Sequence, residues 1–126
     1  VTKLCNQVIV GSLFPVIAEA IRLAEAAGVD ARALPEALKG GFADSLPLQI
    51  FGARMAARNF EPPLSTNAIM LKDLENAASV AKEYGLPLPM TGAAAERYRM
   101  LIAQGRGQAD PAVLVELLAE DRGSAA

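Results

Sequence analysis

Residues 1–28 read VTKLCNQVIVGSLFPVIAEAIRLAEAAG, and this one segment sets the architecture of the whole chain. Its apolar residues recur at helical spacing, and no part of it alternates apolar and polar side chains for long. We expect one helix from about Thr2 to Ala27, ended by Gly28 as the residue after the last turn. At 1.5 Å per residue it is roughly 40 Å long. It therefore crosses the whole of a domain whose radius of gyration is about 14 Å.

The apolar residues of this helix cover most of its circumference, not a single face. A helix of that kind needs cover on several sides. A chain of 126 residues offers few elements to supply it, so the sequence predicts cover from another domain or a second subunit. The apolar residues are Val8, Val10, Leu13, Phe14, Val16, Ile17, Ile21 and Leu23.

Glycine, proline and capping residues divide the rest of the chain into shorter helices. We therefore expect an all-α, multi-helix domain over residues 1–121, with one long N-terminal helix and a disordered tail over residues 122–126. The expected helices are about 31–39 with Asp30 as its cap, 45–58 with Pro47 in its first turn, 65–84, 90–103, and a last one capped by Asp110 that runs to about 119.

Composition excludes several classes of protein. The net charge is −2 and the basic residues are scattered, so there is no footprint for a nucleic acid. The apolar run at residues 8–18 is too short to cross a bilayer, and no signal peptide is recognisable. No cluster has the spacing of a metal site. The single cysteine, Cys5, excludes an internal disulfide and fits a reducing, cytoplasmic location.

Three polar residues at the start of the long helix share one face. Lys3, Asn6 and Gln7 stand at i, i+3 and i+4. Because the chain has no histidine, proton transfer near neutral pH would need another side chain, and Lys3 is a candidate. Taken alone, the three residues fit a solvated lysine with two polar surface neighbours near a helix start better than they fit a catalytic group.

The opening segment resembles the helical domain of β-hydroxyacid dehydrogenases, in which a long helix carries a Lys-x-x-Asn-Asn/Gln motif. It is most similar to 2-hydroxy-3-oxopropionate (tartronate semialdehyde) reductases and 3-hydroxyisobutyrate dehydrogenases. The resemblance implies the fold of the 6-phosphogluconate dehydrogenase C-terminal domain. Further matching segments, which extend the resemblance to about Leu118, are residues 18–20 with Leu23, residues 27–30, residues 40–41 with Ser45, residues 59–60 and residues 71–74.

Two departures from the family pattern stand out. Leu64 occupies the place where the family has an aromatic residue. The dinucleotide-binding Rossmann domain, with its Gly-x-Gly-x-x-Gly turn, is not in the sequence. The resemblance therefore implies the C-terminal half of an enzyme that binds NAD or NADP mainly through its other half, so that the chain alone is expected to be inactive.

The resemblance also implies roles for particular residues. Lys3 would be the general acid/base for interconversion of a short 3-hydroxyacid and its semialdehyde or oxo acid, with Asn6 and Gln7 binding the substrate. Lys72 would bind the cofactor near the nicotinamide ribose. The alternative for Lys72 is a surface pair with Asp73. The role of Asp73 is either to orient Lys72 or to cap backbone groups.

Other residues carry weaker expectations. Phe42, Ser45 and Phe60 lie in segments that face the family's active-site cleft, but each fits packing or capping as well. We expect Cys5 to be a buried core thiol. The resemblance further implies a homo-oligomer, a dimer or tetramer. The rival hypothesis is a non-catalytic helical oligomerisation module derived from the same family.

Overall fold

The computed structural model describes residues 1–117, and within them it contains helices and no strand, as predicted. The predicted ends of the last helix and of the domain, and the predicted tail over 122–126, lie outside the described residues. The elements are α1 (Thr2–Ala26), the 3₁₀ turn η1 (Ala31–Ala33), α2 (Leu34–Leu38), the π-helical turn η2 (Leu48–Gly52), α3 (Ala53–Ala57), α4 (Asn67–Glu83), α5 (Pro89–Ala103) and the 3₁₀ turn η3 (Pro111–Val113).

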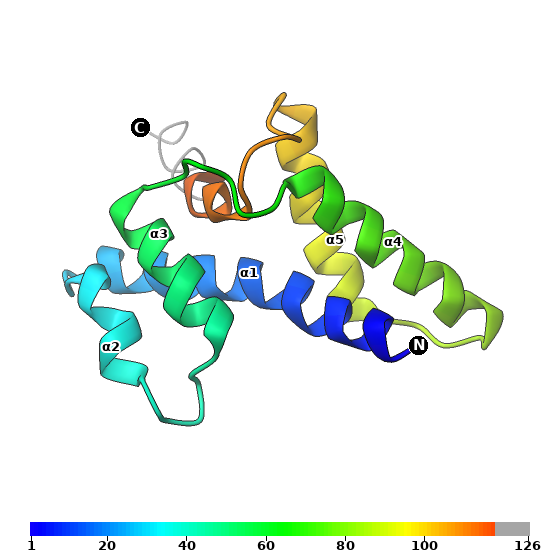
Figure 1. Ribbon diagram of the computed structural model, residues 1–126, viewed down its shortest axis with the longest axis horizontal. Helices are drawn as coiled ribbons and strands as arrows, with labels where there is room; N and C mark the ends of the chain where they lie inside the picture. Colours follow the sequence, from blue (N-terminus) through cyan, green and yellow to red (C-terminus); the bar gives the residue numbers. More distant parts are fainter. Residues whose placement is uncertain (118–126) are drawn as a thin grey trace.

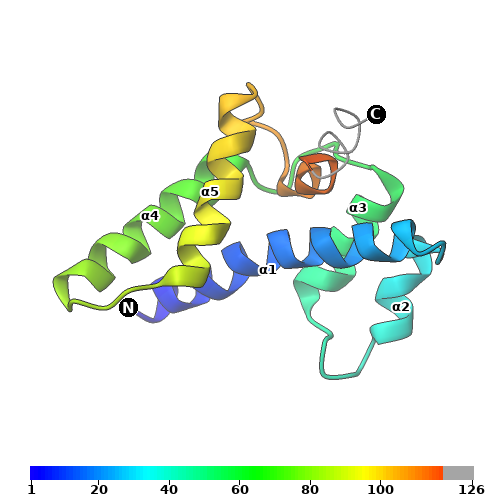
Figure 2. The ribbon, with the colours of Figure 1, turned by 180° about the vertical axis from the view of Figure 1, so that it is seen from behind.

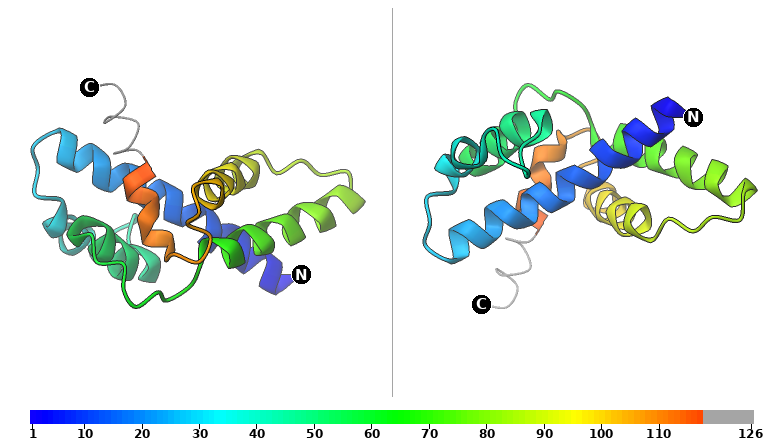
Figure 3. Two further views of the ribbon diagram at one scale, coloured as in Figure 1. Left: turned by 90° about the horizontal axis from the view of Figure 1, so that it is seen from above. Right: turned by 90° about the horizontal axis from the view of Figure 1, so that it is seen from below.

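Helix α1 is the axis of the domain (Figure 1). The α4–α5 pair packs against its N-terminal half, while α2, η2 and α3 gather around its C-terminal half. Seen from behind, these two groups lie at opposite ends of α1 (Figure 2). The segment that begins with η3 lies across the middle of α1 (Figure 3) and contacts it.

The buried face of α1 follows helical spacing, with six residues in the core. The opposite face is apolar but exposed: Ile9, Val16 and Leu23 are 61%, 55% and 71% accessible. By length and composition α1 could cross a bilayer, and 28% of its most apolar window is buried within the domain, on the side that faces the core. Residues 1–117 thus leave one side of this long apolar helix uncovered. The buried residues are Gly11, Phe14, Ile17, Ala18, Ile21 and Ala24.

A proline inside α1 removes one hydrogen bond from the helix, and α5 replaces it. Pro15 has no N–H, so the carbonyl of Gly11, four residues earlier, has no helical donor. The hydroxyl of Tyr98 donates to that carbonyl at 2.6 Å. Tyr98 is fully buried, which raises the pKa of its phenol far above the usual range. Pro15 and Tyr98 are therefore energetically linked, although 83 positions separate them.

We expect Tyr98→Phe to lower the free energy of unfolding by about 1–3 kcal/mol, because it leaves a buried carbonyl without a donor. In a Pro15→Ala background, residue 15 regains an N–H for the Gly11 carbonyl, so the same change should cost clearly less. Urea denaturation of the two single variants and the double variant measures the coupling. Equal costs in both backgrounds would contradict the link.

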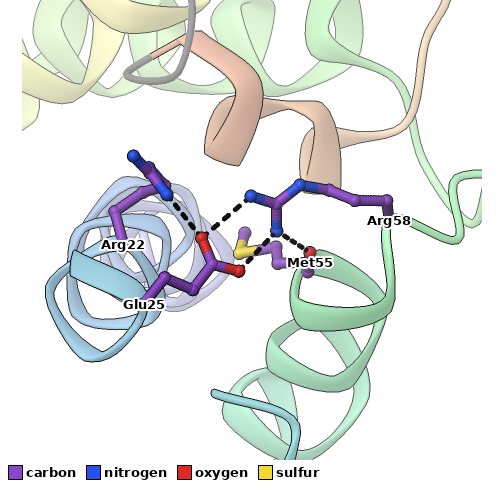
Figure 4. Close-up of polar contacts among 4 residues, drawn as sticks. All are labelled: Arg22, Glu25, Met55 and Arg58. Carbon is purple, nitrogen blue, oxygen red and sulfur yellow. Dashed lines mark hydrogen bonds and ion pairs between the residues drawn. The ribbon is translucent and has the colours of Figure 1, made fainter. Parts of the chain in front are cut away.

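The C-terminal end of α1 is fixed to α3 by charge (Figure 4). The guanidinium of Arg58 donates to both carboxylate oxygens of Glu25 at 2.9 Å, and Arg22 donates to one of them at 2.5 Å. These hydrogen bonds, led by that of Arg58, lower the pKa of Glu25. Arg58 also donates to the carbonyl of Met55. The backbone of Arg58 itself is left-handed (φ 55°), where α3 ends.

Most predicted helix boundaries are confirmed to within two residues. Asp30 caps η1 by accepting from the N–H of Arg32 at 3.1 Å, and Gly28 follows α1 with a φ of 81°. The predicted helix over 45–58 differs in detail. Its helical part covers 46–57 but contains the π turn η2, so it is not one regular α-helix.

Asp110 is a fully buried carboxylate that joins three parts of the chain. It accepts from the N–H of Ala112 at 2.8 Å, as its predicted capping role requires, and also from the N–H of Leu64 at 2.7 Å. The guanidinium of Arg54 lies 3.6 Å away, an ion pair too long to be a good hydrogen bond. Asp110 therefore holds the 59–66 loop, α3 and η3 together.

Candidate active site

Helices α1 and α4 approach closely near the N-terminal end of α1. The Cβ that Gly11 lacks would lie 2.8 Å from Cδ2 of Leu74, so a larger residue there would require the Leu74 side chain to shift. One turn earlier on α1, the side-chain amide of Gln7 donates to the carboxylate of Asp73 at 2.5 Å. The close approach of the helices thus joins two polar residues that are 66 positions apart in sequence.

This contact fixes the orientation of two side-chain amides. An ionised carboxylate can only accept, so Asp73 requires the NH₂ group of Gln7 to point toward it. The Oε1 atom of Gln7 then accepts from Nδ2 of Asn6 at 2.9 Å. In this series of hydrogen bonds, the acceptor that remains is Oδ1 of Asn6. Because Asn6 is exposed, the arrangement presents an oriented oxygen at the surface.

Lys3 lies one helical turn before Gln7, on the same side of α1, and its side chain is exposed. Lys72 precedes Asp73 but lies roughly 100° around α4 from it, on the exposed face. The structure therefore brings Lys3, Asn6, Gln7 and Asp73 to one place, with Lys72 at its edge. Two cations beside an oriented amide pair suit an anionic ligand.

The weaker candidates have structural explanations. Ser45 accepts from the N–H of Leu48 at 3.0 Å and so begins the helix that follows. Phe60 packs against the core. Phe42 is fully exposed in the loop that follows α2. Within this chain, none of the three has a described contact with the Lys3 region.

The prediction for Cys5 is wrong, because its side chain is exposed. Cys5 lies on the same side of α1 as Ile9 and Val16, and it lines an open groove between α1 and α4. The sequence shows that this side is apolar. Only the packing of residues 1–117 shows that it stays exposed.

The structure gives Asp73 a specific hydrogen-bond partner that the sequence did not indicate. The Lys-Asp pair marked it only as a companion of Lys72, whereas the structure bonds it to Gln7. A signal was present: Gly11 falls one turn after Gln7, and a glycine inside an apolar helix marks a close approach of another backbone or side chain. No group of three or more His, Cys, Asp or Glu within residues 1–117 is placed to hold a metal ion.

Comparison with known proteins agrees with this architecture. A protein-family model described as "NAD-binding of NADP-dependent 3-hydroxyisobutyrate dehydrogenase" matches residues 1–118. The chain belongs to the β-hydroxyacid dehydrogenase family. The family match covers α1 through η3, including Lys3, Asn6, Gln7 and Lys72, and so the predicted resemblance is confirmed.

Individual relatives support the same assignment. The 2-hydroxy-3-oxopropionate reductase of Escherichia coli (strain K12) is 38% identical over 116 residues, which are 92% of this chain and 39% of that protein. The crystal structure of 3-hydroxyisobutyrate dehydrogenase from Salmonella typhimurium matches with a TM-score of 0.85 at 23% identity, covering 92% of this chain and 40% of that one. The Mycobacterium tuberculosis 3-hydroxyisobutyrate dehydrogenase, solved with L-serine, gives 0.81 at 25% identity, covering 93% and 42%.

The chain thus spans about two-fifths of the length of these β-hydroxyacid dehydrogenases. The likeness to the Salmonella structure shows the fold of the helical part alone. The dinucleotide-binding fingerprint expected of the family is not among these 126 residues.

Proposed function

We propose that this chain is the helical domain, residues 1–121, of an NAD(P)-dependent oxidoreductase that interconverts a short 3-hydroxyacid and its semialdehyde or oxo acid. The observation that supports it best is the placement of Lys3 one turn from the Gln7–Asp73 contact, in a member of this family. A cation beside an oriented hydrogen-bonding pair is what polarisation of a substrate carbonyl requires.

Lys3 is the proposed general acid/base. In the direction of reduction, its ammonium group polarises the carbonyl and gives a proton to the oxygen. In the direction of oxidation, the neutral amine takes the hydroxyl proton. The bound dinucleotide supplies the hydride chemistry. Asn6 offers its oriented Oδ1 atom to the substrate hydroxyl, and Gln7 holds Asn6 in place through the bond at 2.9 Å.

Lys72 is the proposed contact to NAD or NADP. Its side chain is exposed on α4 beside the Gln7–Asp73 contact, and it has no ion-pair or hydrogen-bond partner within residues 1–117. A cation without an internal partner fits an anionic dinucleotide held mainly by another domain. The proposal also includes a cytoplasmic location and self-association, since α1 leaves an apolar side uncovered.

The same uncovered side favours a second candidate, a helical oligomerisation module without catalysis. This candidate needs neither Lys3 nor the Gln7–Asp73 contact. The two functions therefore differ in what happens when the polar residues are changed.

The test compares the 126-residue chain alone with the same chain fused behind a dinucleotide-binding domain of this family. We expect no turnover from the chain alone, because the hydride donor has no binding domain. The fusion should oxidise one or more short 3-hydroxyacids in a panel assayed with both NAD and NADP. Turnover by the chain alone, or a folded fusion inactive on every acid, would overturn the proposal.

A further inference from the structure

Helices α4 and α5 enclose a groove that none of the residues proposed for catalysis lines. The two helices diverge toward residues 84–88, which join them (Figures 1 and 2), and an open groove of about 410 Å³ lies between them (the α4–α5 groove). Its volume is in the range of small-molecule sites. The groove is hollow because small residues line it: Ala78 and Ala81 on α4, and Gly92 and Ala95 on α5.

The two ends of the α4–α5 groove differ in charge. Between them the floor is apolar, with Leu74 fully buried. At one end, the guanidinium of Arg99 on α5 donates to the carboxylate of Glu75 on α4 at 3.3 Å, so this cation is already paired. Lys82 also lines the groove, about 10 Å further along α4 on the same side. Within residues 1–117 its ammonium group has no ion-pair or hydrogen-bond partner. The second end therefore offers a positive charge to a ligand.

A buried hydroxyl at the same end indicates that the ligand has a polar group. Thr91 lines the α4–α5 groove and is only 3% exposed. In the part of the chain that the structure describes, its hydroxyl makes no hydrogen bond. A buried hydroxyl without a partner costs free energy, which a ligand oxygen in the groove would recover. Thr91 is near the start of α5 and Lys82 near the end of α4, so both lie toward the 84–88 connection.

We propose that the α4–α5 groove binds a medium-chain fatty acid, at a site separate from that of the 3-hydroxyacid. The ammonium group of Lys82 pairs with the carboxylate, and the hydroxyl of Thr91 donates to it. The alkyl chain covers the alanines and Leu74, where the burial of apolar surface stabilises the complex. A short 3-hydroxyacid has no such chain, and its hydroxyl would lie on an apolar floor, so the substrate is a poor ligand for this groove.

The size of the groove favours a single alkyl chain over a segment of another protein. One turn of a partner helix, about 10 Å across, would by itself take up a volume of this order. The inference does not depend on the proposed reaction, because neither Lys82 nor Thr91 belongs to the candidate active site. An inactive protein that binds the fatty acid would leave it standing.

The first test is isothermal titration calorimetry of the 126-residue chain with octanoate. Octanoate should bind saturably, one molecule per chain, and octanol at least about 10-fold more weakly, since it lacks the charge that pairs with Lys82. Lys82→Ala should weaken octanoate binding by on the order of 10-fold, and Thr91→Val by about 3- to 10-fold. Lys3→Ala, which removes an exposed lysine of the candidate active site, is the matched control and should bind octanoate as the wild type does.

The second test fills the groove without disturbing the fold. A Cβ at Gly92 would meet no atom within 4 Å, and leucine is favoured over glycine inside a helix. Gly92→Leu should therefore unfold at the wild-type temperature or above it, yet lose octanoate binding. No saturable binding to the wild type, binding that survives Gly92→Leu, or a Lys3→Ala variant that loses as much affinity as Lys82→Ala would overturn the proposal.

Discussion

Lys3→Ala should lower kcat of the fused enzyme by on the order of 10²- to 10⁴-fold, the usual contribution of a general acid/base. The variant loses both the charge that polarises the carbonyl and the group that moves the proton. Affinity for the dinucleotide should change little, because that binding belongs mainly to the other domain. Steady-state kinetics and cofactor titration on folded protein measure the two effects separately.

Two companion variants define the role of Lys3. Lys3→Arg keeps the positive charge but gives up a proton far less readily, so it should restore little activity. Lys72→Ala should instead weaken cofactor binding more than it slows the chemical step. If Lys3→Ala kept more than about a tenth of the wild-type kcat, a loss below that range, Lys3 would be a solvated surface residue and another group would have to transfer the proton.

The parts of the fold that depend on neighbouring residues in the chain were predictable. Gly28 ends α1, and Asp30 and Asp110 cap the turns that follow them, because each acts on backbone groups within a few positions. The apolar spacing of residues 1–28 predicted the long helix for the same reason. Such local signals are enough for an all-α fold.

Features that depend on how helices cross were not predictable from spacing. The Gln7–Asp73 and Tyr98–Gly11 contacts join positions 66 and 87 residues apart, and each requires the observed approach of α1 to α4 or α5. Cys5 was assigned to the core for the same reason: the pattern shows an apolar helix, but only the packing decides which of its sides is covered.

Asp110→Ala should lower the free energy of unfolding by about 3–5 kcal/mol, as expected when one partner of a buried ion pair is removed. The change takes away the acceptor for the N–H groups of Leu64 and Ala112 and leaves the guanidinium of Arg54 buried beside an apolar side chain. For a domain of ordinary stability, such a loss is a large fraction of the total. Urea denaturation followed by circular dichroism measures it.

Further variants separate the ion pair from the hydrogen bonds. Arg54→Met should cost less than Asp110→Ala, because Asp110 keeps both N–H donors. In the double variant, the buried guanidinium is gone as well, so its total cost should be smaller than the sum of the two single costs. Strictly additive costs would mean that the 3.6 Å contact between Arg54 and Asp110 contributes nothing. Asp110 would then stabilise the domain only through the backbone of the 59–66 loop and of η3.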